Sequence, residues 1–405
     1  MIILVMAWRN IWRNKVRSAI IMCSVAIGLV AGLFVLSLYK GILEDRVSTV
    51  IHTEVSHIQL HHPKFKEDYE AKFVVARTDS VLSKLRGVPG IKSISARTVS
   101  QGMLMTGTGS TGLQIIGVDL ANEKLVSQLD SKIIEGAGFG GKRKNQIIIG
   151  KKLADKMHLQ RGNKAVLTFI DPESNIVSAA FRIVGIYRTD NAPRDERLVY
   201  VQRDDLNSLL AIGASAHEIA IILDDVNSVE ATASSIKALF ENMQVETWSE
   251  ISPETKLMID TTDSYSNIFI MIIMLALSFG IINTMLMAVL ERSREIGMLL
   301  AVGMNRAKIF SMILTETIFL TLTGTPLGIL ITWLIVQIYQ TKGIDISSIG
   351  GMTMSEFGFS SMIYPAFPWE KMPNELMIVT GAALFSALIP AIKAIRLKPV
   401  EALQK

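Results

Sequence analysis

Four long apolar runs constrain this chain more than any other feature of its sequence. They span residues 18–39, 268–290, 309–338 and 374–392. Each is long enough to cross a hydrocarbon layer roughly 30 Å thick as a helix that rises about 1.5 Å per residue. A cleaved signal peptide is the alternative for the first run, but that run is longer than the apolar region of a typical signal peptide. We therefore predict a membrane protein with four transmembrane α-helices.

The stretch between the first and second runs has a different character. Residues 40–267 are polar throughout, and a segment of this length can bury a hydrophobic core of its own. We expect a large extracytoplasmic α+β domain here. Alternating or β-branched patterns predict strands, and helical patterns lie between them. The strands are expected at 55–60, 113–118, 146–149, 165–170, 179–187, 198–201 and 219–223, and the helices at 80–85, 151–157, 204–210 and 228–240.

Composition agrees with a mixed architecture. The chain of 405 residues is 49% hydrophobic and 19% charged, which is too apolar for an ordinary soluble enzyme and too polar for a wholly membrane-embedded protein. A formal net charge of +4 is small for this length and does not indicate a nucleic-acid partner. The single cysteine, Cys23, lies in the first apolar run, so no intrachain disulfide can stabilise the outer domain.

The N-terminal residues 1–17 have the pattern of an amphipathic helix at a membrane surface. Trp8 and Trp12 share one helical face, while Arg9 and Arg13 lie on another. Tryptophan favours the headgroup level, and arginine binds anionic membrane lipid. This segment is expected to lie along the membrane before the first span.

Basic residues predict the orientation of the chain. They gather before the first apolar run, in the segment 291–308 and in the tail 393–405. The positive-inside bias therefore places both termini and the segment 291–308 in the cytoplasm of a bacterial cell, at the inner membrane. The domain at 40–267 and the loop at 339–373 are then outside.

Small residues spaced four apart predict close contacts between helices. Gly28 and Gly32 form such a pair in the first run, and Gly324 and Gly328 form another in the third.

Two polar residues inside the apolar runs need a partner that lipid does not offer. Asn283 is expected to face other helices. Glu316 is a candidate proton relay, but its position about two turns from the cytoplasmic end, near Arg306, favours a structural or coupling role.

The segment 291–308 joins the second and third runs and predicts one short amphipathic helix. Glu291 and Glu295 lie one turn apart at its start, and Gly303 followed by Asn305 is a plausible end. One interpretation is a solvated turn between membrane helices. The other is a helix that docks into a partner's groove, because an apolar stripe has no use in water. That stripe contains Ile296, Leu299, Leu300 and Gly303.

This segment contains the residues Glu291-Arg-Ser-Arg-Glu-Ile-Gly297, followed by Leu300-Ala-Val-Gly303. These residues resemble a signature of the FtsX-like permease family. Its members are membrane subunits of ABC transporters, such as MacB and the lipoprotein-releasing system. The stretch 147–169 resembles the extracytoplasmic domain of MacB-type permeases, and 390–403 resembles the family's C-terminal ending. The resemblance implies that a coupling helix enters the ATPase subunit through Glu291, Arg292, Arg294, Glu295, Ile296, Leu299, Leu300 and Gly303.

The family resemblance also implies partners and a mode of action. It implies two permease subunits, identical or closely related, bound to two ATPase subunits that hold ATP and magnesium, while this chain has no cofactor and catalyses nothing itself. The permease would transmit ATP-driven motion to its outer domain. Overall length and the absence of a fused ATPase resemble the lipoprotein-releasing type, in which the outer domain passes lipoprotein to a periplasmic carrier.

Three alternatives stay open at this point. MacB-like export of peptides or drugs would require a periplasmic adaptor. Control of cell-wall hydrolases, as in FtsX itself, goes with a smaller outer domain. A membrane receptor or scaffold would have no ATPase at all, and the coupling signature argues against it.

Two patterns in the outer domain could be mistaken for sites. The glycine-rich stretch 136–143 matches the start of a phosphate loop, but Arg143 replaces the Ser or Thr that would bind magnesium, and a strand follows where a helix is needed. The histidines at 52, 57, 61 and 62 could bind a metal, yet they lack a tight ligand set and are expected to be polar surface residues. No metal site is predicted.

Overall fold

The computed structural model describes residues 2–13, 15–140 and 143–396, and these residues form two compact units. Unit 1 comprises Met1–Leu43, Ile259–Ile344 and Ile363–Lys405, of which Met1, Asn14 and the tail from 397 lie outside the described residues. Unit 2 comprises Glu44–Met258 and Asp345–Met362, without 141–142. The chain passes between the units within the unbroken helices α2 and α12.

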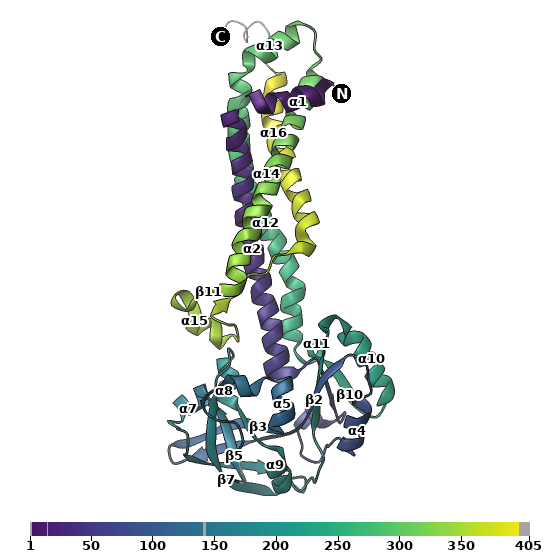
Figure 1. The fold of residues 1–405 in the computed structure, drawn as a ribbon, viewed down its shortest axis with the longest axis vertical. Helices are drawn as coiled ribbons and strands as arrows, with labels where there is room; N and C mark the ends of the chain where they lie inside the picture. The colour runs from purple at the N-terminus through teal and green to yellow at the C-terminus, as the bar shows by residue number, and fades with distance from the viewer. Residues whose placement is uncertain (1, 14, 141–142, 397–405) are drawn as a thin grey trace. The chain divides into compact units, whose positions relative to one another are not determined.

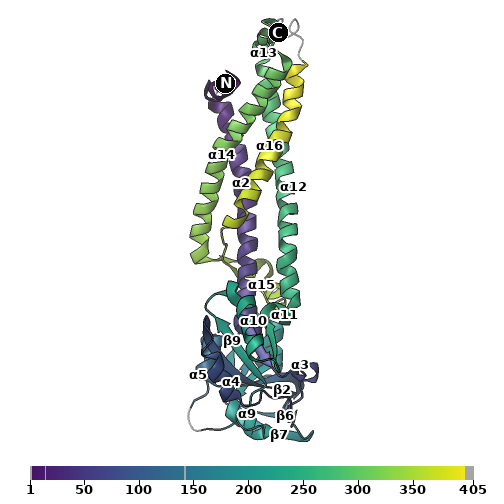
Figure 2. The same ribbon diagram turned by 90° about the vertical axis from the view of Figure 1, so that its right-hand side faces the viewer.

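Unit 1 is helical (Figure 1). Among the described residues, four helices are long and apolar enough to cross a membrane, over Ser18–Val55, Pro253–Glu291, Arg306–Lys342 and Trp369–Ile395. Figure 2 shows them running lengthwise beside one another. The helices of unit 1 are α1 (Ile2–Arg13), α2 (Lys15–Thr49), α12 (Pro253–Glu291), α13 (Ser293–Ala301), α14 (Arg306–Lys342) and α16 (Met372–Ile395), with a 3-10 turn η3 (Trp369–Lys371).

The helices of unit 1 approach closely at their glycines. A Cβ atom on Gly324 would lie 2.9 Å from the carbonyl oxygen of Met22, and one on Gly328 would lie 3.0 Å from that of Ala26. Helix α14 therefore packs against the backbone of α2 where the sequence predicts close contact. Gly28 of α2 instead faces the side chain of Leu277, and Gly32 has Met274 at van der Waals distance.

Helix α1 lies against α14. The ring centroids of Trp8 and Phe319 are 5.6 Å apart, with an edge-to-face angle of 86°. Ala7 and Ile11 are buried, while Trp8 and Trp12 remain 44% and 53% exposed. This division into a packed face and an exposed aromatic face is the arrangement of an amphipathic helix at a membrane surface.

Unit 2 is built on a ten-stranded mixed sheet with the order β10-β1-β9-β2-β3-β8-β5-β7-β4, and β6 pairs with β2 and β7. Helices cover it, so the unit has the α+β fold that the sequence predicts. The strands are β1 (Ile58–His61), β2 (Ile91–Thr106), β3 (Gly109–Val118), β4 (Ile133–Gly136), β5 (Gln146–Gly150), β6 (Lys164–Ile170), β7 (Ile176–Tyr187), β8 (Leu198–Gln202), β9 (Glu218–Leu223) and β10 (Gln244–Thr247). The helices are η1 (Val50–Val55, π-helical), α3 (Phe65–Asp68), α4 (Thr78–Leu85), α5 (Leu120–Val126), α6 (Leu129–Lys132), α7 (Lys151–Lys156), α8 (Ala192–Arg197), η2 (Val226–Ser228, 3-10), α9 (Arg203–Leu210), α10 (Val229–Leu239), α11 (Trp248–Ile251) and α15 (Ser347–Glu356).

Strand β2 joins two separate hydrophobic cores. Its first part, Ile91–Arg97, pairs with β9 beside a core that includes Leu60 and Ile236. Its second part, Thr98–Thr106, pairs with β3 beside a core that includes Phe181. The sheet is therefore continuous across two lobes.

The predicted strands and helices of the outer domain are all present, but the sequence does not predict strands β2, β4 and β10 or the short helices α3, α5, α6, α8 and α11. The buried positions of β2 include Ser95, Arg97, Thr98 and Ser100, and these polar residues hide the apolar–polar alternation that would indicate a strand. The expected outer loop at 339–373 also contains more structure than its sequence indicates: helix α15 and a short β11–β12 pair (Ile344–Asp345 and Met362–Ile363).

Candidate coupling site

The segment between α12 and α14 folds as one short helix, α13, with a defined end. Gly303 has φ of +93°, a conformation that glycine adopts without strain. The amide of Met304 donates to the carbonyl of Leu299 at 2.9 Å, which closes the last turn of α13. The side chain of Asn305 then accepts from the amide of Ala307 at 3.1 Å and begins α14. The chain thus reverses direction in a few residues.

A chain of charged side chains connects α1, α13 and α14. Arg13 donates to both carboxylate oxygens of Glu295, at 2.5 and 2.6 Å from Nη2. Glu295 also accepts from Nε of Arg292 at 3.2 Å, and Nη1 of Arg292 lies 3.2 Å from Oε2 of Glu316. The sequence separation of 282 residues between Arg13 and Glu295 makes this contact invisible to pattern analysis.

The charges in this chain differ in exposure. The side chains of Arg13 and Glu295 are 53% and 41% exposed, whereas those of Arg292 and Glu316 are 14% and 10% exposed. Hydrogen bonding from Arg13 lowers the pKa of Glu295, and partial burial opposes that shift. Arg292 therefore links an exposed carboxylate on α13 to a nearly buried one on α14. The predicted structural role of Glu316 stays a prediction, and the structure shows Arg292 as an ion-pair partner of Glu316.

The two faces of α13 have different environments. Ile296 is 3% exposed, and Leu299 and Leu300 pack against the core of unit 1. The residues left outward are Arg294, Met298 at 48% exposure and Val302 at 89%. The apolar stripe expected to enter a partner thus faces the chain's own helices, because Ile309, Ile313 and their neighbours offer it a dry surface.

The other predicted residues of this region lie as follows. Glu291 and Gly303 are exposed, and Arg292 is half-buried. Asn283 lies on an exposed side of α12, so within this chain it does not face the other helices as expected. Within a bilayer an exposed amide of this kind needs a partner from outside the chain.

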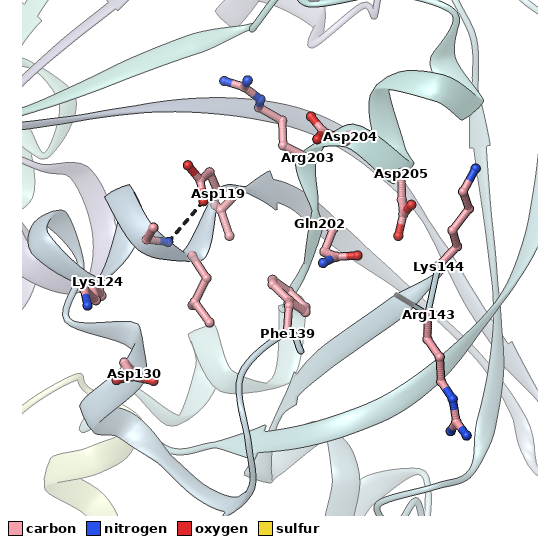
Figure 3. A pocket seen from close by; sticks show the side chains of 13 residues that line it. Asp119, Lys124, Asp130, Phe139, Arg143, Lys144, Gln202, Arg203, Asp204 and Asp205 are labelled. Carbon is pink, nitrogen blue, oxygen red and sulfur yellow. Dashed lines mark hydrogen bonds between the residues drawn. The ribbon is translucent and has the colours of Figure 1, made fainter. Parts of the chain in front are cut away.

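The glycine-rich stretch of unit 2 lines a cavity of about 590 Å³, shown in Figure 3. Gln146 closes the loop by accepting from the amide of Gly140 at 3.0 Å and donating to its carbonyl at 2.8 Å. Strand β5 follows, as expected, while Gly141 and Lys142 of the phosphate-loop pattern lie outside the described residues. Acidic and basic side chains are equally represented in the lining, namely Asp119, Asp130, Asp204 and Asp205 with Lys124, Arg143, Lys144 and Arg203. This balance gives the cavity no preference for phosphate.

The histidines expected at the surface of the outer domain are partly buried, which corrects that expectation. His57 is 7% exposed, and its Nδ1 accepts from the amide of Leu223 at 2.9 Å. His61 is 1% exposed and bonds Glu246 at 2.9 Å. Both side chains can be buried because backbone and carboxylate partners satisfy the hydrogen-bonding capacity of their ring nitrogens. The described residues contain no group of three or more side chains placed to hold a metal.

One buried ion network in unit 2 was missed by sequence reasoning. Arg97 of β2 contacts Glu123 of α5 at 2.6 Å and Glu218 of β9 at 3.0 Å. Ser95 adds a hydrogen bond of 2.6 Å to the same Glu123. The three charged residues lie in separate elements far apart in the sequence, so only the fold brings them together.

Comparison with known proteins gives two family matches. Residues 18–239 match the MacB-like periplasmic core domain, and residues 267–399 match the FtsX-like permease C-terminal domain. The first match alone covers more than half of the chain.

Three relatives show how the chain compares over its length. Identity is 24% to the pyoverdine export ATP-binding/permease protein PvdT of Pseudomonas entomophila (strain L48), over 98% of this chain and 58% of the relative. It is 23% to the uncharacterized ABC transporter permease YknZ of Bacillus subtilis (strain 168), over 98% of each. It is 21% to the lipoprotein-releasing system transmembrane protein LolC of Neisseria meningitidis serogroup B (strain ATCC BAA-335 / MC58), over 97% of this chain and 95% of the relative. The chain spans less than two thirds of PvdT but nearly all of the other two.

These matches agree with the order of the parts along the chain. The α+β unit lies between the first and second membrane-spanning helices, and the remaining spans form the permease part of a multi-pass inner-membrane protein. The chain belongs to the FtsX-like permease family of ABC transporters, with a MacB-like periplasmic core domain.

Proposed function

We propose that this permease transmits motion from a separate ATPase subunit to its α+β domain, with α13 as the helix that contacts the ATPase. The observation that carries the proposal is the division of α13 into two faces. Its inner face, with Ile296, is packed into unit 1, and its outer face, with Met298 and Val302, is apolar and exposed. An exposed apolar face beside a charged residue, Arg294, suits a protein groove and not open water.

Arg292 supports this mechanism from the inner side of α13. It is paired with Glu295 on α13 and with Glu316 on α14, so a displacement of α13 acts on α14 through ion pairs as well as packing. Such coupling requires two arrangements of the helices that the bound ATPase favours unequally.

The proposed assembly follows from this role. Two permease subunits, identical or closely related, bind two ATPase subunits, and ATP and magnesium are held by the ATPases. Both termini and α13 are then cytoplasmic and unit 2 lies outside the membrane, in keeping with the positive residues near α1 and α13. The exposed Asn283 fits a surface between two permease subunits.

We propose release of lipoprotein from the inner membrane to a periplasmic carrier as the transported process. LolC, a transmembrane protein of a lipoprotein-releasing system, matches this chain over 95% of its own length. Export through a periplasmic adaptor is the second candidate, favoured by the match to PvdT, a pyoverdine export protein.

The test of coupling uses Met298→Asp and Val302→Asp in the full chain, expressed in its native host. Both residues are exposed, so the variants should insert and fold, but a carboxylate in the docking face should reduce recovery of the ATPase roughly tenfold or more. The matched control is Val226→Asp, a 45% exposed residue of unit 2. Equal ATPase recovery with all three variants would show that α13 is not part of the interface with the ATPase.

The same purification identifies the cargo class by mass spectrometry. Lipoproteins or their carrier bound to the wild-type chain, together with accumulation of lipoprotein in the inner membrane of the Met298→Asp strain, support release. A periplasmic adaptor without lipoprotein supports export instead. If no ATPase is recovered with the wild-type chain, the coupling mechanism is wrong.

A further inference from the structure

Unit 2 contains a second cavity, of about 390 Å³, whose lining differs from that of the pocket in Figure 3. Three segments form it: the end of α2 with η1, the region of α6, and the residues after β7. Its lining residues are Ser48, Thr49, His52, Thr53, Gln128, Ser131, Lys132, Ile134, Arg188, Thr189 and Asp190. Hydroxyl and amide groups predominate, and two strong cations face one carboxylate.

The unusual member of this lining is Lys132. It is half-buried, and its Nζ donates to the hydroxyl of Thr53 at 2.7 Å and to the carbonyl of Ser127 at 3.2 Å. Both acceptors are neutral, and Lys132 forms no ion pair within the described part of the chain. An ammonium group has three donors, so one remains for a ligand. Carboxylates lie near Lys132, but no described one forms an ion pair with it, and an anionic ligand would give this partly desolvated cation a direct countercharge.

Arg188 supplies the second cation. Its side chain is exposed, while its backbone amide donates to the carbonyl of Lys132 at 2.9 Å, so the two cationic residues are held beside each other. No side-chain partner of Arg188 occurs among the described residues. A guanidinium group with free donors is suited to binding oxyanions.

The hydroxyl groups differ in availability. Those of Ser131 and Thr189 already donate, to Gln128 and Asp195 respectively. Ser48 and Thr49 have no side-chain hydrogen bond in the described structure and so remain available. Two cations together with two free hydroxyls provide more donors than the two oxygens of a carboxylate can use, and suit a tetrahedral oxyanion.

We propose that this cavity binds a phosphate group, with Lys132 and Arg188 as its charged ligands and Ser48 and Thr49 as hydroxyl donors. The group is either free phosphate or the phosphate of a lipid headgroup, and the chemistry of recognition is the same. A phosphate group bound here would contact η1, α6 and the chain after β7 at the same time. The π-helical turn of η1 supports this assignment, because such turns are frequent at functional sites.

The ionisation of Lys132 agrees with the geometry. Burial, followed by the nearby Arg194, lowers the pKa of Lys132 to about 8, while Asp190, Asp195 and Glu123 act in the opposite direction. Lys132 is thus still mostly protonated at neutral pH, and a bound phosphate would favour its charged form further.

The test uses the full chain in a non-ionic detergent and three variants, Lys132→Gln, Arg188→Gln and Arg182→Gln. Arg182 is the matched control, since it is an exposed arginine of β7 outside the cavity. Two probes are applied. Inorganic phosphate is compared with chloride at equal ionic strength by the shift in unfolding temperature, and retained glycerophospholipid is measured by native mass spectrometry.

The expected result is binding by wild type and Arg182→Gln, with affinity roughly tenfold or more lower in Lys132→Gln and Arg188→Gln. A response to inorganic phosphate identifies a free phosphate site, and phospholipid retention without that response identifies a headgroup site. Because Lys132 also anchors Thr53, Arg188→Gln decides the matter if Lys132→Gln fails to fold. Absence of both signals in the wild type, or equal binding by Arg188→Gln and Arg182→Gln, would overturn the proposal.

Discussion

The two units hold their charged residues in opposite ways. In unit 1 the chain from Arg13 to Glu316 begins at a side chain 53% exposed and ends at one 10% exposed. In unit 2 the network of Arg97, Glu123 and Glu218 is closed, with side-chain exposures of 6%, 0% and 12%. One network is open to water at one end, and the other is sealed.

This difference teaches what each network is suited to do. Breaking a buried ion pair leaves an uncompensated charge in a medium of low dielectric constant, so the network of unit 2 favours a single arrangement. Exposed pairs contribute little stability because water and salt replace the partner, so the outer pair of the coupling site can exchange partners at low cost. In the proposed function, the helix that contacts the ATPase needs that freedom, and the domain that receives its motion needs rigidity.

The largest expected effect comes from neutralising Glu123, the fully buried carboxylate of the sealed network. Glu123→Gln should lower the free energy of unfolding of unit 2 by about 3–5 kcal/mol, because Arg97 loses its principal countercharge in a buried site. Thermal unfolding of the full chain in detergent, followed by circular dichroism, measures the loss.

Two further variants make this result specific. Glu230→Gln, at an exposed position on α10, is the control and should leave the unfolding temperature unchanged. The triple variant Arg97→Met with Glu123→Leu and Glu218→Leu should recover much of the stability, since it removes all three charges of the network. A Glu123→Gln variant as stable as the control would show that the network does not fix the fold of unit 2.

Acid should weaken unit 2 through its buried histidines. Burial, then His52 and Lys92, lowers the pKa of His57 to about 4, so His57 is neutral in the fold and protonates more readily when unfolded. Neutral His57 therefore contributes fully to the free energy of unfolding above pH 6.5. As the pH falls towards 4 this contribution is lost, and the free energy of unfolding decreases by up to about 3 kcal/mol. Burial also lowers the pKa of His217, whose Nδ1 accepts from the amide of Val99, so it acts in the same direction.

The measurement is the unfolding temperature of the full chain between pH 7 and pH 4. His57→Met removes one titrating group and should give a shallower dependence on pH, even if its stability at pH 7 is lower. His158→Gln, an exposed position, should keep the wild-type slope. Identical slopes for all three proteins would contradict the assignment of a neutral buried His57.

The smallest expected effect is at the open end of the coupling site. Arg13→Gln should change the stability of unit 1 by less than about 1 kcal/mol, although its contact with Glu295 is bidentate, because both side chains are well exposed. Thermal unfolding at low and high salt measures this change, with Arg9→Gln as the matched control. If Arg13→Gln lowers the free energy of unfolding as much as Glu123→Gln does, the two networks do not differ as proposed.

Local patterns predicted the four long helices and most strands of the two units, but not the charged contacts of either unit. The apolar runs indicated the four long helices, and β-branched runs such as those in β5 and β9 indicated strands. The glycines at 324 and 328 indicated close contact because only a missing side chain permits it. These features depend on residues near one another in the sequence.

The features that were missed depend on the fold. Helical periodicity showed that Ile296 and Leu299 share a face, but it could not show whether that face meets the chain's own helices or a partner. Likewise, Arg97 is polar and gives no local sign of burial, since its burial depends on Glu123 and Glu218 reaching it from other elements. The cavity around Lys132 combines three segments for the same reason.

The unbroken helix α2, Lys15–Thr49, limits how the length of this chain can vary. One residue inserted in the middle of a helix turns everything after it by about 100°, because a turn takes about 3.6 residues. Seven inserted residues nearly restore the original direction, with a difference of about 20°. Helix α12 also carries the chain between the units, so a change of length there meets the same condition. An insertion in the middle of α2 or of α12 should therefore keep the packed face of that helix continuous only when it adds close to whole turns.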